Sequence, residues 1–217
     1  MNDIYWYISD AKVEKLQHVA TSFLAKVAAE LSFKFPLFEG KLSGASDSSL
    51  VSDVKRISER LVQDEKVESF DVLGGGDTPR LISFSGAGGR YVDKNAFWLV
   101  LKGERNALLL AGSPAHAVGR EPTADTYVSP SVDPVSALRA AFDGDPSFHG
   151  HSLSASLSYA WQEIARGSLL SEGGVPRVEG LAFFARSVPT DQRQLRRVGC
   201  SNLENLVIGS PLYVRQV

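Results

Sequence analysis

The chain has 217 residues, of which 43% are hydrophobic and 22% are charged, and its formal net charge is -2. This is ordinary globular composition, and a chain of this length can bury a core without disulfide or metal cross-links. The small negative charge argues against a general binder of nucleic acid or of anionic membranes, because such proteins need an excess of basic residues. A single cysteine, Cys200, cannot form an internal disulfide, and no signal peptide or membrane span is visible. We therefore expect a cytoplasmic protein, and nothing in the sequence implies a cofactor.

The first part of the chain predicts a strand followed by helices. Residues 4–8 are aromatic and β-branched, which is typical of a strand. Two capping residues follow, and apolar residues then recur at three- and four-residue steps, which predicts a helix over 13–31. Segment 33–42 carries a proline and is interpreted as extended. A second amphipathic helix is expected at 48–62.

The middle of the chain predicts a β meander, because short apolar segments alternate with glycine-rich or polar links. Its strands are expected at 68–73, 81–85, 96–101 and 107–111. Residues 113–134 form the longest predicted loop. The remaining elements are two helices at 134–142 and 153–166 and two strands at 181–185 and 206–214.

Together these elements predict an α+β fold, with a mixed, largely antiparallel sheet of six or seven strands and about four packed helices. We expect one domain over 1–217. The phrase Gly-Ser-Pro follows an apolar run twice, in LLLAGSPAHAV (108–118) and in LVIGSPLYV (206–214). Either the chain contains a duplication, with pseudo-symmetric halves 1–130 and 131–217, or two strands share the same turn chemistry. In the second case glycine permits close backbone approach and proline cannot donate to a ladder.

Candidate ligand-binding residues follow predicted strands. Ser9, Asp10 and Lys12 lie where the first strand passes into a helix, which is where open α/β folds bind anions. Arg80 and Arg90 follow the glycine-rich loops GGGDTP and SGAGG, whose amides could hold a phosphate. The structural alternatives are a helix cap with a solvated lysine and two flexible hairpin turns.

The two Gly-Ser-Pro phrases supply the other candidates. His116 lies in the small-residue loop GSPAHAVG and is placed to act as a general base or a phosphate donor, with Ser113 and Ser210 as further candidates. A packed loop histidine is the alternative. His149 and His151 lack a third ligand, so no metal site is expected. No catalytic residue can be assigned, because neither a Gly-x-Ser-x-Gly elbow nor a Walker A motif is present.

Three phrases of the sequence resemble a known family. YWYISDAKVEKL near the start, GSPAHAVG in the middle and IGSPLYV at the end are similar to motifs of an uncharacterised bacterial family, common in actinobacteria, that is grouped under a domain of unknown function. The resemblance covers nearly the whole chain, and the sequence departs from the family pattern at Glu14 and Lys15. It implies no activity. It does imply a place in bacterial conflict or signalling systems, as a sensor or an accessory protein.

The absence of a complete catalytic constellation in the sequence favours a non-catalytic module that binds a small anionic ligand or a protein partner. One alternative is an enzyme that acts on a phosphorylated or nucleotide ligand through His116, Asp10 and Lys12, which requires the three side chains to converge. The other is a structural homo-oligomer that buries an apolar patch on segment 33–42. Membranes and nucleic acids are not expected partners.

Overall fold

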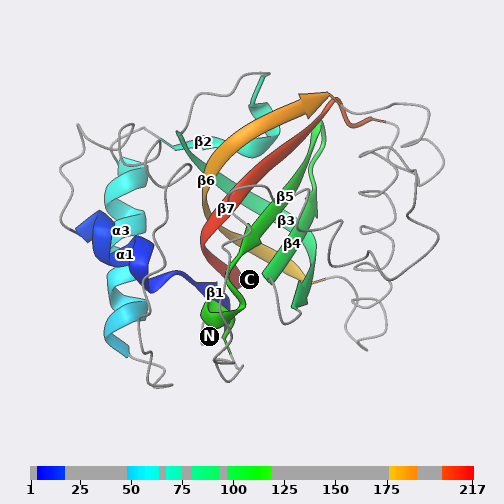
Figure 1. The fold of residues 1–217 in the computed structure, drawn as a ribbon. Helices are drawn as coiled ribbons and strands as arrows, with labels where there is room; N and C mark the ends of the chain where they lie inside the picture. The colour runs from blue at the N-terminus through cyan, green and yellow to red at the C-terminus, as the bar shows by residue number, and fades with distance from the viewer. Residues whose placement is uncertain are drawn as a thin grey trace.

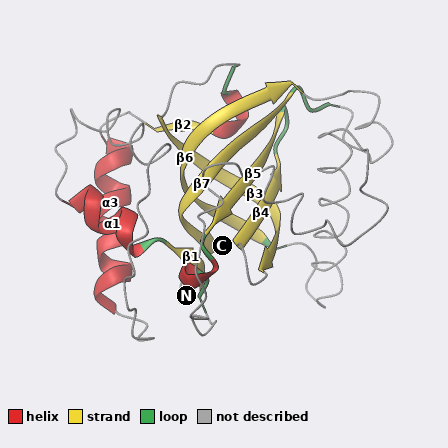
Figure 2. Ribbon diagram, in the orientation of Figure 1, coloured by secondary structure: helices red, strands yellow, loops and turns green. Residues whose placement is uncertain are grey.

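The computed structural model describes residues 4–17, 48–63, 67–74, 80–92, 97–118, 176–189 and 202–217. This part of the chain is mostly strand (Figures 1 and 2). The strands are β1 (Ile4–Ile8), β2 (Val67–Ser69), β3 (Arg80–Val92), β4 (Phe97–Lys102), β5 (Asn106–Gly112), β6 (Arg177–Pro189) and β7 (Asn205–Gln216). The helices are α1 (Asp10–Gln17) and α3 (Ser48–Gln63), with short 3-10 turns η2 (Phe70–Val72) and η3 (Pro114–His116).

Five of the strands close into a barrel. The order around it is β7, β5, β4, β3 and β6, and β6 pairs again with β7. Strand β1 pairs with β7 outside this ring, and β2 pairs with β3. All of these pairs are antiparallel except β2 with β3 and β5 with β7. Closure leaves none of the five strands as the open edge of a sheet.

The predicted α+β fold with four packed helices is wrong, because the sheet closes on itself. Closure depends on three strands of 12 or 13 residues, β3, β6 and β7. The first half of β3 pairs with β6 and its second half with β4, so a single strand bridges two neighbours. The predicted helices at 134–142 and 153–166 and the extended segment 33–42 lie outside the described residues.

Side chains alternate between the inside and the outside of the barrel, as in other small barrels. The inside is filled by large apolar side chains from each strand of the ring, among them Phe84, Leu99, Leu110, Phe184 and Val207. Phe70 and Leu73 of the η2 segment and Trp6 and Tyr7 of β1 belong to the same buried cluster.

A second apolar cluster joins the helices to the outside of the barrel. Helix α3 presents Val54, Ile57 and Leu61 at three- and four-residue steps, and all three are buried. They pack with Val13 and Leu16 of α1 over an outer face of β6 and β7. Figure 1 shows the two helices side by side at one side of the barrel. No helix in the described part of the chain is long and apolar enough to cross a membrane.

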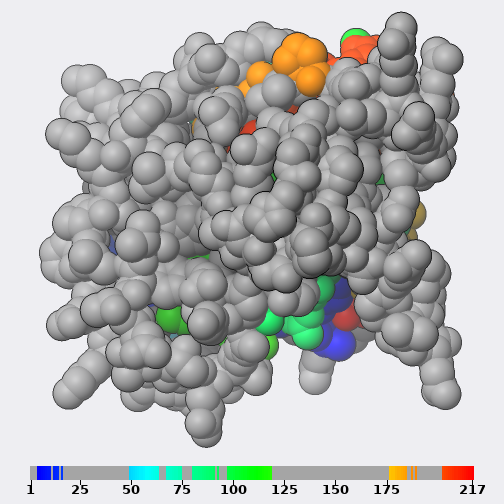
Figure 3. All heavy atoms as spheres, turned by 45° about the vertical axis from the view of Figure 1, so that its right-hand side comes forward, coloured from blue at the N-terminus to red at the C-terminus, as the bar shows by residue number. Residues whose placement is uncertain are grey.

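The two ends of the described chain meet at the barrel. Ile4 of β1 pairs with Gln216 of β7. In the space-filling view of Figure 3, blue, green and red atoms from the start, the middle and the end of the chain lie together at the lower edge. Strand β1 is therefore held against the C-terminal strand β7 up to Ile8, two residues before α1 begins.

Candidate functional site

The passage from β1 into α1 is held against β7. The Ser9 amide donates to the carbonyl of Leu212 at 2.9 Å. The Ser9 carbonyl accepts from the amides of Lys12 at 3.1 Å and Val13 at 2.9 Å, so the first turn of the helix starts from this residue. Ser9 itself is buried. The N-terminal turn of α1 is consequently a fixed part of the barrel surface.

Lys12 reaches from this turn into the second Gly-Ser-Pro phrase. Its Nζ donates to Ser210 Oγ at 2.5 Å and to the carbonyl of Pro211 at 2.8 Å. The side chain passes over the ring of Phe183, whose centroid is 5.7 Å from Nζ, and the residue is only 4% exposed. Burial lowers the pKa of Lys12 from 10.5 to about 7. An amine with such a pKa carries a proton on only part of the molecules at neutral pH.

The first Gly-Ser-Pro phrase meets the same turn through His116. The Oγ of Ser113 accepts from the Ala115 amide at 3.3 Å, and the His116 amide donates to the Ser113 carbonyl at 3.2 Å, which shapes η3. His116 Nδ1 then lies 2.9 Å from Asp10 Oδ1, and its ring stands edge-on to Tyr7 at 5.8 Å. Asp10 and His116 therefore form a contact at the start of α1.

The parallel pairing of β5 with β7 explains why both phrases arrive at one place. Leu110 is opposite Gly209 in this pairing. Each phrase needs its glycine because of close packing: a Cβ on Gly112 would lie 2.5 Å from the hydroxyl of Tyr7, and one on Gly209 would lie 2.4 Å from the carbonyl oxygen of Phe183. The first phrase ends β5, whereas the second lies inside β7, next to an irregularity in its pairing with β6.

Six of the eight predicted site residues thus gather at the start of α1. They are Ser9, Asp10, Lys12, Ser113, His116 and Ser210. They form two contacts rather than one cluster, because residues two apart on a helix do not face each other. His116 meets Asp10, and the amine of Lys12 meets Ser210.

The other two predicted residues lie elsewhere on the barrel. Arg80 pairs with Glu68 at 3.1 Å and lies over the ring of Phe184 at 5.0 Å. Arg90 lies over the ring of Trp6 at 4.7 Å. The SGAGG segment before Arg90 is not a loop, because all of it belongs to β3. The predicted glycine loop at 85–90 is therefore wrong, whereas a binding role for Arg90 stays a prediction.

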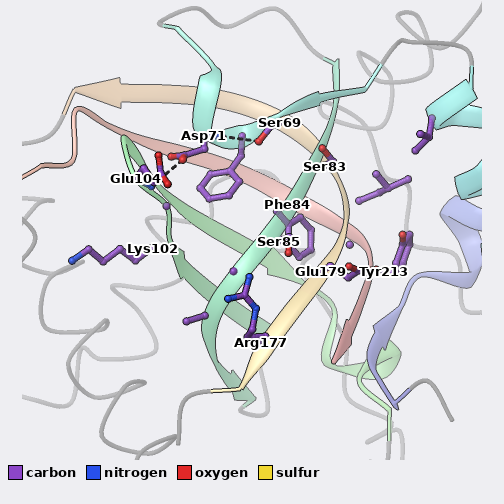
Figure 4. Close-up of a pocket in the computed structure, with 17 residues that line it drawn as sticks. Ser69, Asp71, Ser83, Phe84, Ser85, Lys102, Glu104, Arg177, Glu179 and Tyr213 are labelled. Atoms are coloured by element: carbon purple, nitrogen blue, oxygen red, sulfur yellow. Dashed lines mark hydrogen bonds between the residues drawn. The ribbon is translucent and has the colours of Figure 1, made fainter. Parts of the chain in front are cut away.

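A pocket opens between the η2 segment, β3 and β6. Its volume is about 640 Å³, within the range of about 300–1,000 Å³ that is usual for small-molecule sites. Its floor is the outward face of β3, where the small side chains of Ser83, Ser85 and Ala87 line it. Figure 4 shows Ser85 and Phe84 near the middle, Arg177 reaching toward them from β6, and Glu179 with Tyr213 on the side toward the helices.

One wall of the pocket is fixed by Asp71. Its carboxylate accepts three backbone amides of the β4–β5 hairpin, those of Glu104, Arg105 and Asn106, each at 2.9 Å. Burial acts to raise the pKa of Asp71, but these amides and the charge of Arg105 outweigh it, so the pKa lies below 3.8. Asp71 is therefore an anion that the protein itself neutralises.

Both acidic and basic residues line the pocket. Three acidic residues line it, Asp71, Glu104 and Glu179. Asp71 is held by amides, and Glu179 Oε1 accepts from Arg215 Nε at 2.7 Å and also from its Nη2. Two basic residues line the same pocket, Lys102 and Arg177, and Arg177 is exposed.

None of the eight predicted site residues lines this pocket. One signal in the sequence points to its floor: in ISFS (82–85) apolar and polar residues alternate, which is typical of a strand with one buried face. The other walls come from η2, the β4–β5 hairpin and β6, which the sequence gives no reason to bring together. Among the described residues, no group of three His, Cys, Asp or Glu side chains is placed to hold a metal ion.

The described part of the chain is a closed five-stranded barrel, with two helices packed beside it and a polar pocket in its wall. The chain belongs to a family of unknown function, DUF7019, whose profile matches residues 3–217. The match covers nearly the whole chain, as the motif resemblance implied. No curated protein and no solved structure matches the chain.

Proposed function

We propose that this protein is a module that binds a small anionic ligand in the pocket between η2, β3 and β6. The observation that carries the proposal is the pocket itself, whose volume of about 640 Å³ and polar lining suit a small polar molecule. The closed barrel supports it, because a site built on strands is held more rigidly than one built on loops. A place as a sensor or accessory protein in bacterial signalling or defence is the biological role that we propose with it.

The charge distribution favours an anion. Amides and Arg215 already engage Asp71 and Glu179, which are two of the three carboxylates of the lining. Arg177 adds an exposed guanidinium to the same lining. A guanidinium beside serine hydroxyls offers several donors to a carboxylate or a phosphate, and it matches the planar or tetrahedral arrangement of their oxygens.

A thermal-shift experiment tests the proposal with inorganic phosphate, citrate and AMP as probes. Ser85→Trp fills the pocket from its floor. Ser49→Trp is the matched control, because Ser49 is an exposed serine that does not line the pocket. It lies at the N-terminal end of α3, whereas the pocket reaches α3 at Val62, near the other end. We expect at least one probe to raise the melting temperature of the wild type and of Ser49→Trp equally, and to leave Ser85→Trp unchanged. A rise that persists in Ser85→Trp, or no rise with any of the three probes, would contradict the proposal.

A further inference from the structure

Lys12 is a buried amine, and its contacts within the described part of the chain are with uncharged groups. Its amine donates to the Ser210 hydroxyl and the Pro211 carbonyl, and it lies over the ring of Phe183. Among the described residues no carboxylate contacts it, and burial is the cause of its lowered pKa. A buried ammonium without a charged partner is costly, so the fold favours the neutral amine.

Two charged side chains of α1 and α3 have contacts of their own. Asp10, in the same helical turn, contacts His116. Arg60 of α3 donates to the carbonyl of Leu16 at 2.5 Å. The hydrogen bonds of the Lys12 amine go to two neutral partners on β7.

Ser210 is placed to use that amine. The 2.5 Å contact puts the Lys12 nitrogen within proton-transfer distance of the hydroxyl. The Pro211 carbonyl holds another amine hydrogen at 2.8 Å, which fixes the orientation of the nitrogen. Ser210 is partly exposed while Lys12 is buried, so of the two residues the serine is the one that borders solvent. Ser113 of the first Gly-Ser-Pro phrase is also partly exposed, but its Oγ meets the Ala115 amide instead of an amine.

We propose that Ser210 and Lys12 form a nucleophile–base pair that takes the acyl group of a small carboxylic ester. The Ser210 oxygen bonds to the acyl carbon while its proton moves to Lys12 Nζ. The bond from the acyl carbon to the ester oxygen then breaks, and the leaving alcohol takes the proton from Lys12. Water attacks the acyl-serine with Lys12 as base, which releases the carboxylic acid and restores the hydroxyl. Serine–lysine pairs of this kind are one solution to acyl transfer. The inference goes beyond the proposed binding function and does not rest on it.

A fluorophosphonate probe tests the pair, because a serine oxygen displaces its fluoride as it would the alcohol of an ester. The full chain is incubated with the probe, and the labelled peptide is identified by mass spectrometry. We expect the label on Ser210, no such label in Ser210→Ala, and the wild-type rate in Ser113→Ala, the matched control from the other phrase. Lys12→Met should slow labelling by about 100-fold or more, the usual size of general-base catalysis.

The pH profile of the wild type keeps the test decisive even where Lys12→Met fails to fold. The labelling rate should rise with pH and level off above a midpoint near 7, where Lys12 becomes neutral. The absence of a label on Ser210 in the folded wild type would overturn the inference. A rate that does not change with pH, or a folded Lys12→Met that labels at the wild-type rate, would also overturn it and leave Lys12 as a tether between α1 and β7.

Discussion

Loss of the Asp71 carboxylate should destabilise the protein and loosen the wall of the pocket. Oδ1 accepts the amides of Arg105 and Asn106, and Oδ2 accepts that of Glu104, each at 2.9 Å. A hydrogen bond to a charged group contributes about 1.5–3 kcal/mol. Two of these bonds are exposed and the one from Asn106 is partly buried, so each belongs at or below the low end of that range. We therefore expect Asp71→Ala to lower the free energy of unfolding by about 3 kcal/mol.

Urea unfolding at several pH values measures this effect. The folded pKa of Asp71 is below the unfolded value of 3.8, so its stabilisation is complete above that value and disappears as the pH falls through the folded pKa. The difference between wild type and Asp71→Ala should be constant near neutral pH and shrink in acid. Glu104→Ala is the control, because it removes a neighbouring exposed carboxylate. Equal stability of the two variants, or a difference that persists in strong acid, would refute the reasoning.

Two further predictions concern the start of α1. Gly112→Ala should lower the free energy of unfolding by about 1–3 kcal/mol, because its new Cβ would lie 2.5 Å from the Tyr7 hydroxyl. Gly74→Ala is the control and should be nearly neutral, because a Cβ there would have no atom within 4 Å. Thermal melts of the two variants measure the difference. The pKa of Lys12 is about 7 in the folded protein and 10.5 in the unfolded chain. Between pH 7 and pH 10.5 the Lys12 amine is therefore protonated in the unfolded chain and neutral in the folded protein. The free energy of unfolding of the wild type should therefore rise with pH across this window, by up to about 1.4 kcal/mol per pH unit, and Lys12→Met should lack this rise. Urea unfolding measures both, and the same pH dependence in the two proteins would contradict the prediction.

Local patterns in the sequence predict several elements closely. The strand at 4–8 has the bounds of β1, and the amphipathic helix at 48–62 ends one residue before α3 does. Strands β4 and β5 also lie within a residue of their predicted positions, because their apolar runs end at a short polar link. These elements depend on periodicity and turn chemistry, which neighbouring residues determine.

The barrel could not be predicted in the same way. Its closure depends on β6 pairing with both β3 and β7, and β3 and β6 lie about a hundred residues apart in the chain. Glycines inside β3 also resemble a loop in the sequence. Only the packed structure shows that a side chain at Gly88 of β3 would crowd Leu101, and that one at Gly180 of β6 would overlap the Tyr213 carbonyl. Glycines that permit close packing and glycines that form turns look alike in one sequence.

The candidate residues at the start of α1 could be found from the sequence, but their contacts could not. Strand ends and capping residues pointed to Ser9, Asp10 and Lys12, and the repeated phrase pointed to His116 and Ser210. The parallel pairing of β5 with β7 then decides which of them meet. The pocket was missed because its lining comes from five or more elements that are far apart in the chain.

Native mass spectrometry of gently purified protein tests the central claim most directly, because it needs no guess about the ligand. If the pocket binds a small anionic molecule, part of the wild-type chain should carry a low-mass adduct. The same adduct should appear on Ser49→Trp and be absent from Ser85→Trp, and its mass would name the ligand class. Spectra that show only the bare chain in all three proteins, or an adduct that Ser85→Trp keeps, would contradict the account.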